Sequence, residues 1–228
     1  MSDQSSPDFA VIFDVDGVLV DSEKLMGEVV SDLLARRGVD FNKLIDPSGQ
    51  NHVGGSADQM IRLIKNQFGV VIDKQEFTKE RAVEVRKVLS DKPPESNLIR
   101  LLEDLKERGV KMAVATSGEA LTTATKLDLL GVEQFFEAII TSQDVTNHKP
   151  HPDPYLAAAE KLGVPNIDCV AIEDSVLGTR AGRAAGMKVI AFLKHSQLSP
   201  DEVEADLIVH DWDDVNYQTL EKLVKQSG

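Results

Sequence analysis

The chain has 228 residues, of which 42% are hydrophobic and 28% charged. These values are typical of a globular protein and exclude a disordered chain. Its formal net charge of -13 argues against a nucleic-acid partner, because binding to a phosphate backbone needs clustered Lys and Arg. No apolar run approaches the roughly 20 residues that span a bilayer, no signal peptide is evident at the start, and the single cysteine, Cys169, provides no disulfide framework. We therefore expect a cytoplasmic protein with no membrane partner, and a monomer as the default state.

Six short apolar runs rich in valine and isoleucine predict buried strands, and they cover residues 10–13, 111–115, 138–141, 169–172, 189–193 and 207–209. Helical spacing marks most of the segments between them. Three of these segments carry apolar stripes that stop at a glycine: residues 98–105 before Gly109, Leu121, Ala124 and Leu127 before Gly131, and residues 155–162 before Gly163. This alternation predicts βαβ units with right-handed crossovers. We therefore expect an α/β protein whose core is a doubly wound, Rossmann-like parallel sheet.

The alternation is interrupted once, between the first and second predicted strands. From about residue 22 to residue 90 the pattern is helical, with apolar stripes that end at Gly38, at Gly69 and before Lys92-Pro93-Pro94. Helices of this kind predict a small bundle inserted after the first strand. We expect residues 8–21 and 91–228 to form the α/β core, and residues 22–90 to form an inserted α-helical cap domain.

Two aspartates, Asp14 and Asp16, follow the first predicted strand directly. Residues i and i+2 of a strand point to the same face, so both carboxylates are expected to point to the same place. There they would repel each other and raise each other's pKa unless a positive group lies between them.

Polar side chains also follow the next three predicted strands. Ligands of doubly wound sheets lie beyond the carboxyl ends of the strands, and those ends carry Thr116-Ser117-Gly118, Lys149 and Glu173-Asp174-Ser175. Taken singly, each group has a structural explanation as a turn, a helix cap or a solvated loop charge. Their occurrence after successive parallel strands instead favours a common site.

The combination suits phosphoryl transfer, in which positioning and charge neutralisation matter more than covalent chemistry by the protein. Asp14 and Asp174, with Glu173 nearby, can hold a hard cation such as Mg²⁺, which takes oxygen ligands. Asp14 can attack phosphorus and form an aspartyl-phosphate. Asp16 can donate a proton to the leaving oxygen and later accept one from water. The groups left to bind phosphoryl oxygens are Thr116, Ser117 and Lys149.

These residues resemble the four motifs of the haloacid dehalogenase superfamily, and the helical insert resembles the cap of its phosphatase and β-phosphoglucomutase-like branch. The similarity runs from Phe9 to about His210 and is carried by Asp14-x-Asp16-Gly17-Val18, Thr116-Ser117, Lys149-Pro150 and Glu173-Asp174-Ser175. The resemblance implies an aspartyl-phosphate mechanism with Mg²⁺, in which Asp14 is the nucleophile and Asp174 a metal ligand. It also implies that Asp16 is the acid/base and binds the metal through its backbone carbonyl.

Within this superfamily, three activities must be distinguished. A dehalogenase is disfavoured, because members that attack carbon do not keep an acid at the position of Asp16. Mutases resemble this chain but carry an arginine in a cap loop, whereas the corresponding residues 52–58 contain neither Arg nor Lys. We therefore expect a phosphatase acting on a small phosphorylated metabolite, with a sugar phosphomutase as the alternative. In the same loop, Gly55 and Ser56 either contact substrate when the cap closes or form an ordinary loop.

A non-catalytic protein that only binds a phosphorylated ligand is a further alternative, but every catalytic position is filled. Two other residues have structural explanations. Cys169 lies inside a predicted strand and is expected to be a small core residue. Trp212, between Asp211 and Asp213, is expected to be a surface anchor.

Overall fold

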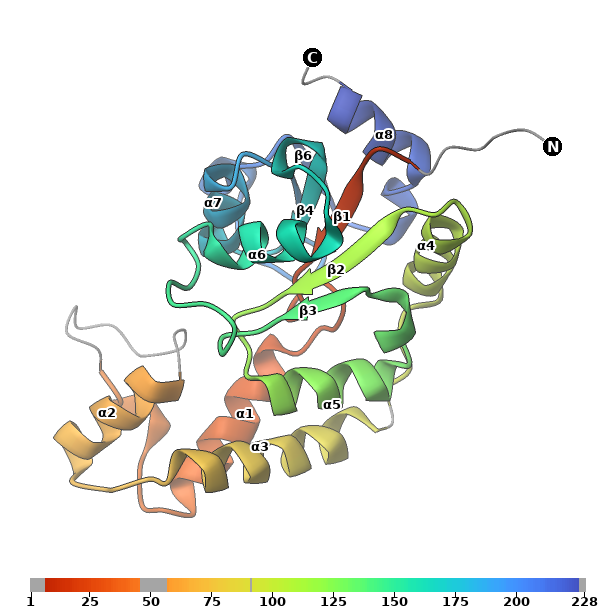
Figure 1. Cartoon of the computed structure of the whole chain (residues 1–228). Helices are drawn as coiled ribbons and strands as arrows, with labels where there is room; N and C mark the ends of the chain where they lie inside the picture. Colours follow the sequence, from red (N-terminus) through yellow and green to blue (C-terminus); the bar gives the residue numbers. More distant parts are fainter. Residues whose placement is uncertain (1–6, 46–56, 91, 226–228) are drawn as a thin grey trace.

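The computed structural model describes residues 7–45, 57–90 and 92–225. Within these residues, six strands form one sheet in the order β3-β2-β1-β4-β5-β6 (Figure 1), and every neighbouring pair is parallel. The strands are β1 (Ala10–Phe13), β2 (Lys111–Ala115), β3 (Ala138–Ile140), β4 (Cys169–Glu173), β5 (Lys188–Phe192) and β6 (Leu207–Val209). The strand order reverses between β1 and β4, as in a doubly wound sheet. The predicted α/β core is confirmed.

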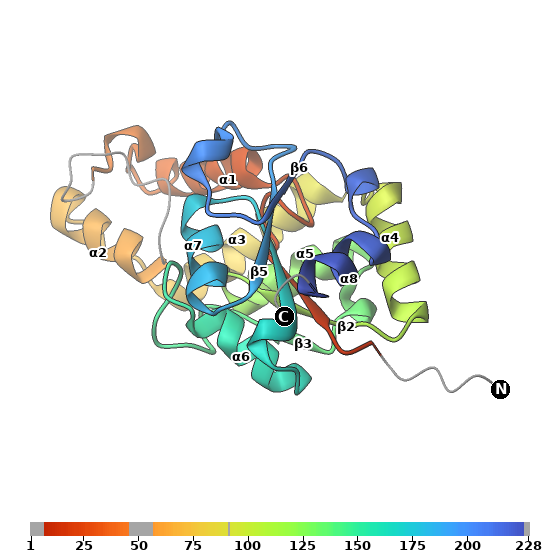
Figure 2. The ribbon, with the colours of Figure 1, turned by 90° about the horizontal axis from the view of Figure 1, so that it is seen from above.

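Helices cover both faces of the sheet, which is why its central strands are continuous apolar runs. On one face, Val11 and Phe13 pack with α4 (Ser96–Glu107), α5 (Ala120–Leu130) and α8 (Tyr217–Lys225). On the other face, Ala10 and Ile12 pack with α6 (Asp153–Leu162) and α7 (Val176–Ala184) (Figure 2). Cys169 is fully buried on this second face, as its position in an apolar strand predicts.

Three helices between β1 and α4 form what we call the helical insert. They are α1 (Glu23–Ala35), α2 (Ala57–Phe68) and α3 (Lys74–Leu89), with the short 3₁₀ helix η1 (Phe41–Lys43) after α1. The insert lies beyond one end of the sheet (Figure 1). It has an apolar cluster of its own, whose most enclosed side chains are Leu33, Leu34, Leu44, Ile64 and Phe77.

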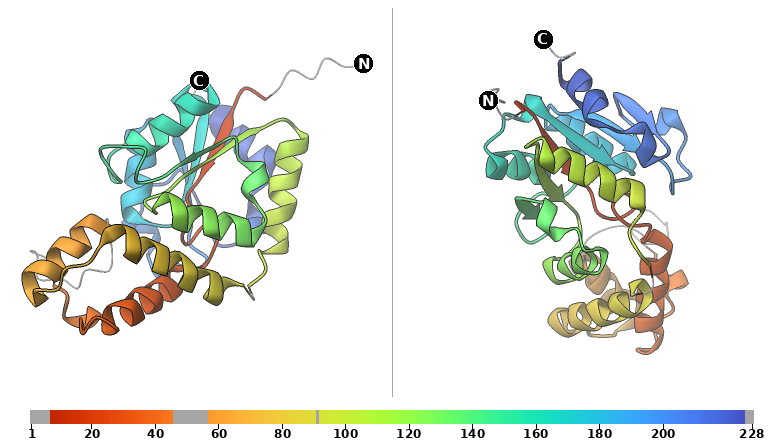
Figure 3. Two further views of the ribbon diagram at one scale, coloured as in Figure 1. Left: turned by 60° about the horizontal axis from the view of Figure 1, so that its bottom comes forward. Right: turned by 90° about the vertical axis from the view of Figure 1, so that its right-hand side faces the viewer.

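The insert meets the core chiefly where α3 lies along α5 (Figure 3). Arg81 of α3 donates a 2.6 Å hydrogen bond to Glu119, the residue preceding α5, and Thr78 donates one of 2.7 Å to the same carboxylate oxygen. Both charged side chains are buried, with 12% of Arg81 and 7% of Glu119 exposed. The contact between insert and core is therefore polar at its centre.

The chain crosses between core and insert twice, and the loop after β5 contacts both crossings. In that loop, Lys194 donates a 2.6 Å hydrogen bond to Glu95, just before α4. His195 lies 3.3 Å from Glu95 and 3.6 Å from Asp21, just before α1. One short segment therefore joins the two connections of the insert.

Two predictions about burial are wrong: one placed Leu121 on the buried stripe of its helix, and the other placed Trp212 at the surface. Leu121 is exposed, and the buried face of α5 includes Thr122, Thr125 and Lys126, because this helix is enclosed by the core and by α3. Trp212 is fully buried, stacked on Phe192 with ring centroids 4.3 Å apart, so it is a core residue. Among the described residues, none of the helices has the length and apolar character that crossing a membrane requires.

Candidate active site

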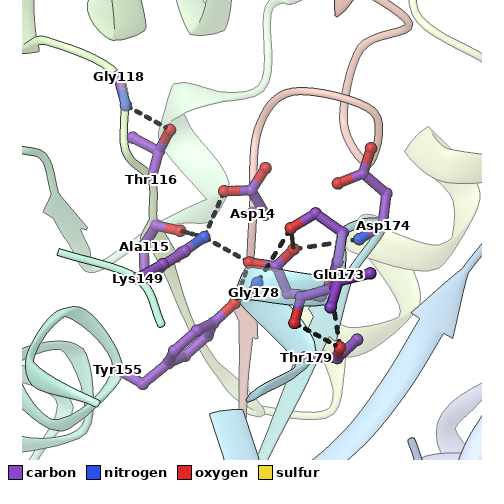
Figure 4. Close-up of polar contacts among 12 residues, drawn as sticks. Asp14, Ala115, Thr116, Gly118, Lys149, Tyr155, Glu173, Asp174, Gly178 and Thr179 are labelled. Carbon is purple, nitrogen blue, oxygen red and sulfur yellow. Dashed lines mark hydrogen bonds and ion pairs between the residues drawn. The ribbon is translucent and has the colours of Figure 1, made fainter. Parts of the chain in front are cut away.

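Asp14 lies directly after β1, at the point where the strand order reverses. Its backbone N–H donates to the carbonyl of Ile172 at 3.0 Å, which fixes it against the end of β4. Its carboxylate accepts a 2.6 Å hydrogen bond from Lys149 Nζ, on Oδ1. Lys149 Nζ also donates to the carbonyl of Ala115 at 2.9 Å and contacts Glu173 (Figure 4). One buried ammonium thus connects the ends of β1, β2 and β4.

Glu173 is the most enclosed charge of this group, with 0% of the residue exposed. Oε1 accepts from Lys149 and, at 2.8 Å, from the hydroxyl of Tyr155. Oε2 accepts from the backbone N–H of Asp174 at 3.1 Å and from Ser175 Oγ at 3.2 Å. Burial would lower the pKa of Lys149, but the Asp14 and Glu173 carboxylates outweigh it and raise that pKa above its ordinary value. Lys149 therefore stays charged.

Three carboxylates, those of Asp14, Glu173 and Asp174, each offer an oxygen within 4.8 Å of the other two. Burial raises the pKa of Asp14 to about 7, with Lys149 opposing the shift and Glu173 adding to it. Burial also raises the pKa of Asp174 to about 9, with Asp14 and Glu173 adding to it. The cluster thus holds more negative charge than one lysine neutralises. An all-oxygen set of this kind fits Mg²⁺.

The carboxylate of Asp174 lies against the backbone that follows Asp16. A Cβ atom built on Gly17 would fall 1.6 Å from Asp174 Oδ2, and Gly17 has a φ of +80°, which other residues rarely adopt. Only glycine therefore fits this close approach. The contact brings the Asp174 carboxylate beside the turn at Asp16, whose backbone carbonyl is the third metal ligand implied by the family resemblance.

Asp16 takes partners different from those of Asp14. Its Oδ1 accepts hydrogen bonds from Lys126 Nζ of α5 and from Ser22 Oγ. The two carboxylates therefore pair with different lysines, Asp14 with Lys149 and Asp16 with Lys126, and the charge of Asp16 contributes to raising the pKa of Asp14. Burial would raise the pKa of Asp16, but Lys126 outweighs it, with Ser22 and Arg81 adding to the lowering. Each aspartate has its own lysine.

The remaining predicted residues differ in their placement. Thr116 is buried after β2 and accepts a 3.0 Å hydrogen bond from the N–H of Gly118 at Oγ1. Ser117 is exposed at the same strand end. Gly55 and Ser56 lie outside the described residues.

The sequence motifs did not include Lys126, Tyr155 or the pair of Arg81 and Glu119. Tyr155 was part of a predicted helical stripe, but nothing local indicated that its hydroxyl reaches Glu173. Lys126 lies four residues after Thr122, on the face that proves to be buried. The sequence could have indicated Lys126 in one way: it lies on the same face as the polar residue Thr122, in a helix that the sequence assigns to the core.

Residues 11–192 match the family model described as haloacid dehalogenase-like hydrolase. The chain belongs to this family. Among curated family relatives, it is 31% identical over 204 residues to hexitol phosphatase B of Escherichia coli (strain K12), covering 87% of this chain and 90% of that protein. It is also 35% identical over 195 residues to Protein SUPPRESSOR OF QUENCHING 1, chloroplastic, of Arabidopsis thaliana. That match covers 80% of this chain and 17% of the much longer relative.

A solved structure shows the same fold. CbbY from Rhodobacter sphaeroides, crystallised in complex with phosphate, superposes with a TM-score of 0.79 at 22% sequence identity, covering 93% of this chain and 98% of that chain.

Proposed function

We propose that this chain is a Mg²⁺-dependent phosphatase that hydrolyses a small phosphomonoester through an aspartyl-phosphate on Asp14. The observation that carries the proposal is the buried Asp14 carboxylate, held by Lys149 on Oδ1 and grouped with two further carboxylates within reach of one cation. The names of phosphatase relatives such as hexitol phosphatase B support a sugar or polyol phosphate as substrate.

In this proposal, Asp14 and Asp174 hold the metal, with the backbone carbonyl of Asp16. Glu173 belongs to the same cluster, but its two oxygens already accept four hydrogen bonds. It would have to release one of these donors to bind the ion directly. When bound, Mg²⁺ would neutralise the crowded carboxylates and offset the charge of the phosphoryl group.

The chain's own residues then account for both chemical steps. An Asp14 oxygen attacks phosphorus while the bond from phosphorus to the leaving oxygen breaks, and Asp16 gives that oxygen a proton. Asp16 next takes a proton from water as the water oxygen attacks phosphorus and the bond to Asp14 breaks. The products are the alcohol and phosphate. Lys149 and Thr116 bind phosphoryl oxygens in both steps, and we keep Ser117, Gly55 and Ser56 as predicted substrate contacts.

Phosphate release from a panel of phosphomonoesters, with and without Mg²⁺, tests the proposal. We expect Mg²⁺-dependent release, and Asp14→Asn should lose at least about 10⁴-fold in kcat because an amide is a poor nucleophile. Intact-mass spectrometry of rapidly quenched wild-type enzyme should detect a phosphorylated chain that Asp14→Asn lacks. Unchanged turnover by Asp14→Asn would contradict the nucleophile assignment. Isomerisation of a sugar phosphate without phosphate release would favour the phosphomutase.

A further inference from the structure

Lys126 is a buried lysine in the middle of α5, with 4% of its side chain exposed. Lysine is rarely buried unless its charge is paired. In the part of the chain that the structure describes, its ion pair is with Asp16. An apolar side chain could fill this buried position without a charged partner. The reason for a lysine here is therefore to be sought in what it does to Asp16.

The contacts of Asp16 are unequal at its two oxygens. Lys126 and Ser22 both donate to Oδ1. No described residue donates a hydrogen bond to Oδ2, and 37% of the Asp16 side chain is exposed. Two donors from separate elements, α5 and the segment before α1, therefore fix one oxygen and leave the other for proton exchange.

We propose that Lys126 is a positioning residue that, together with Ser22, orients the carboxylate of Asp16 so that Oδ2 meets the leaving oxygen of the substrate. This inference rests on the proposed phosphatase function. It adds to the reaction a residue that touches neither substrate nor metal.

The chemistry defines when this positioning matters. Asp16 enters this step protonated at Oδ2, carrying the proton that it took from water when the preceding aspartyl-phosphate was hydrolysed. As the bond from phosphorus to the leaving oxygen breaks, that proton moves to the leaving oxygen, and Asp16 becomes an anion beside the ammonium of Lys126. An alkoxide departs poorly without this proton, whereas a nitrophenolate departs well without it. A loss of orientation should therefore slow alkyl esters more than aryl esters.

The test compares kcat/KM for an alkyl phosphomonoester and for p-nitrophenyl phosphate in wild type and in Lys126→Met, with Mg²⁺ saturating. We expect kcat/KM of the alkyl ester to fall on the order of 10²-fold and that of the aryl ester to fall at least about tenfold less. Asp16→Asn gives the largest ratio of alkyl-ester loss to aryl-ester loss that can be expected, because an amide cannot donate the proton. Arg86→Met is the control, because it removes the cation of an exposed ion pair, that of Arg86 on α3 with Asp128 on α5, and it should leave both rates unchanged.

Equal losses for the two esters in Lys126→Met would overturn the positioning role and leave Lys126 a structural residue. If Lys126→Met does not fold, Ser22→Ala decides, since it removes the second donor to Oδ1 and keeps the lysine paired. In Ser22→Ala, kcat/KM of the alkyl ester should again fall more than that of the aryl ester, by a smaller factor than in Lys126→Met. Rates equal to those of wild type would overturn the proposal. Failure of the proposed function is distinguishable, because wild type itself would then release no phosphate beyond Asp14→Asn.

Discussion

Glu173 has no exposed surface and accepts hydrogen bonds at both oxygens, and Gly178 leaves the room that its carboxylate occupies. A Cβ atom built on Gly178 would lie 1.8–2.0 Å from the carboxylate atoms of Glu173. No side-chain contact in a folded protein is this short, so any larger residue must displace the carboxylate. Because Glu173 also contacts Lys149, displacing the carboxylate should shift Lys149, which holds Asp14.

We predict that Gly178→Ala lowers the free energy of unfolding by about 1–3 kcal/mol and reduces kcat at least about tenfold. Urea unfolding and phosphate release measure the two effects. Gly27→Ala is the control, because a Cβ there meets nothing within 4 Å, and alanine favours the helix by about 1 kcal/mol. Equal activity in the two variants would show that Glu173 can move without effect.

At the level of elements, two of the ion pairs between α3 and the segment of α5 with its preceding residue differ in their exposure. Arg81 and Glu119 form the buried pair, with 12% and 7% of their side chains exposed, and Arg86 and Asp128 the exposed one, with 55% and 60%. Removing one partner from a buried pair leaves an uncompensated charge, whereas exposed pairs contribute little.

We therefore expect Glu119→Gln to destabilise the protein by about 3 kcal/mol and Asp128→Asn by less than about 1 kcal/mol. Chemical denaturation at one pH compares the two variants directly. Similar small losses would mean that Arg81 finds another partner when Glu119 is neutral.

The elements themselves could largely be predicted from the sequence, because their signals are local. Central strands buried on both faces are apolar runs, and glycine after a stripe marks a helix end, so strand ends at β3, β4 and β5 differ by only one residue. The same local signals placed Asp14, Lys149 and Asp174 after the carboxyl ends of three parallel strands.

What failed depends on contacts between distant segments. Trp212 looked exposed because aspartates flank it, but Phe192 and Phe13 from two strands enclose its ring. Lys126 was not among the candidate residues, because its partner lies 110 positions away. Neither neighbour can be identified from the surrounding sequence.

For the whole molecule, the crowded carboxylates link stability to pH. The folded-state pKa values of Asp14 and Asp174, about 7 and about 9, exceed the ordinary value of 3.8. The folded protein therefore binds protons more tightly than the unfolded chain, and its stability falls as pH rises from 3.8 towards 9. A bound cation would remove this loss, since it favours the ionised carboxylates.

We predict that the metal-free protein loses stability between pH 6 and pH 9, and that Asp174→Asn shows a smaller loss over the same range. Mg²⁺ should stabilise wild type more at pH 9 than at pH 6, and should stabilise Asp174→Asn less. Thermal unfolding of chelator-treated wild type and Asp174→Asn at pH 6 and pH 9, with and without added Mg²⁺, measures the pH-dependent loss and the stabilisation by Mg²⁺ for each protein. Parallel pH profiles for the two proteins would contradict the raised pKa of Asp174.

The segment Lys194-His195 lies beside both places where the chain passes between sheet and insert, near Asp21 and at Glu95. The two covalent links are thus gathered at one point, while the polar contact of Arg81 with Glu119 lies elsewhere. If α3 separates from α5, we expect the insert to rotate about a hinge at these two connections. The loop after β5, with Lys194 and His195, lies against that hinge. Substitutions at residues 194–195 are therefore expected to change how freely the insert moves against the sheet, although those residues lie outside the carboxylate cluster.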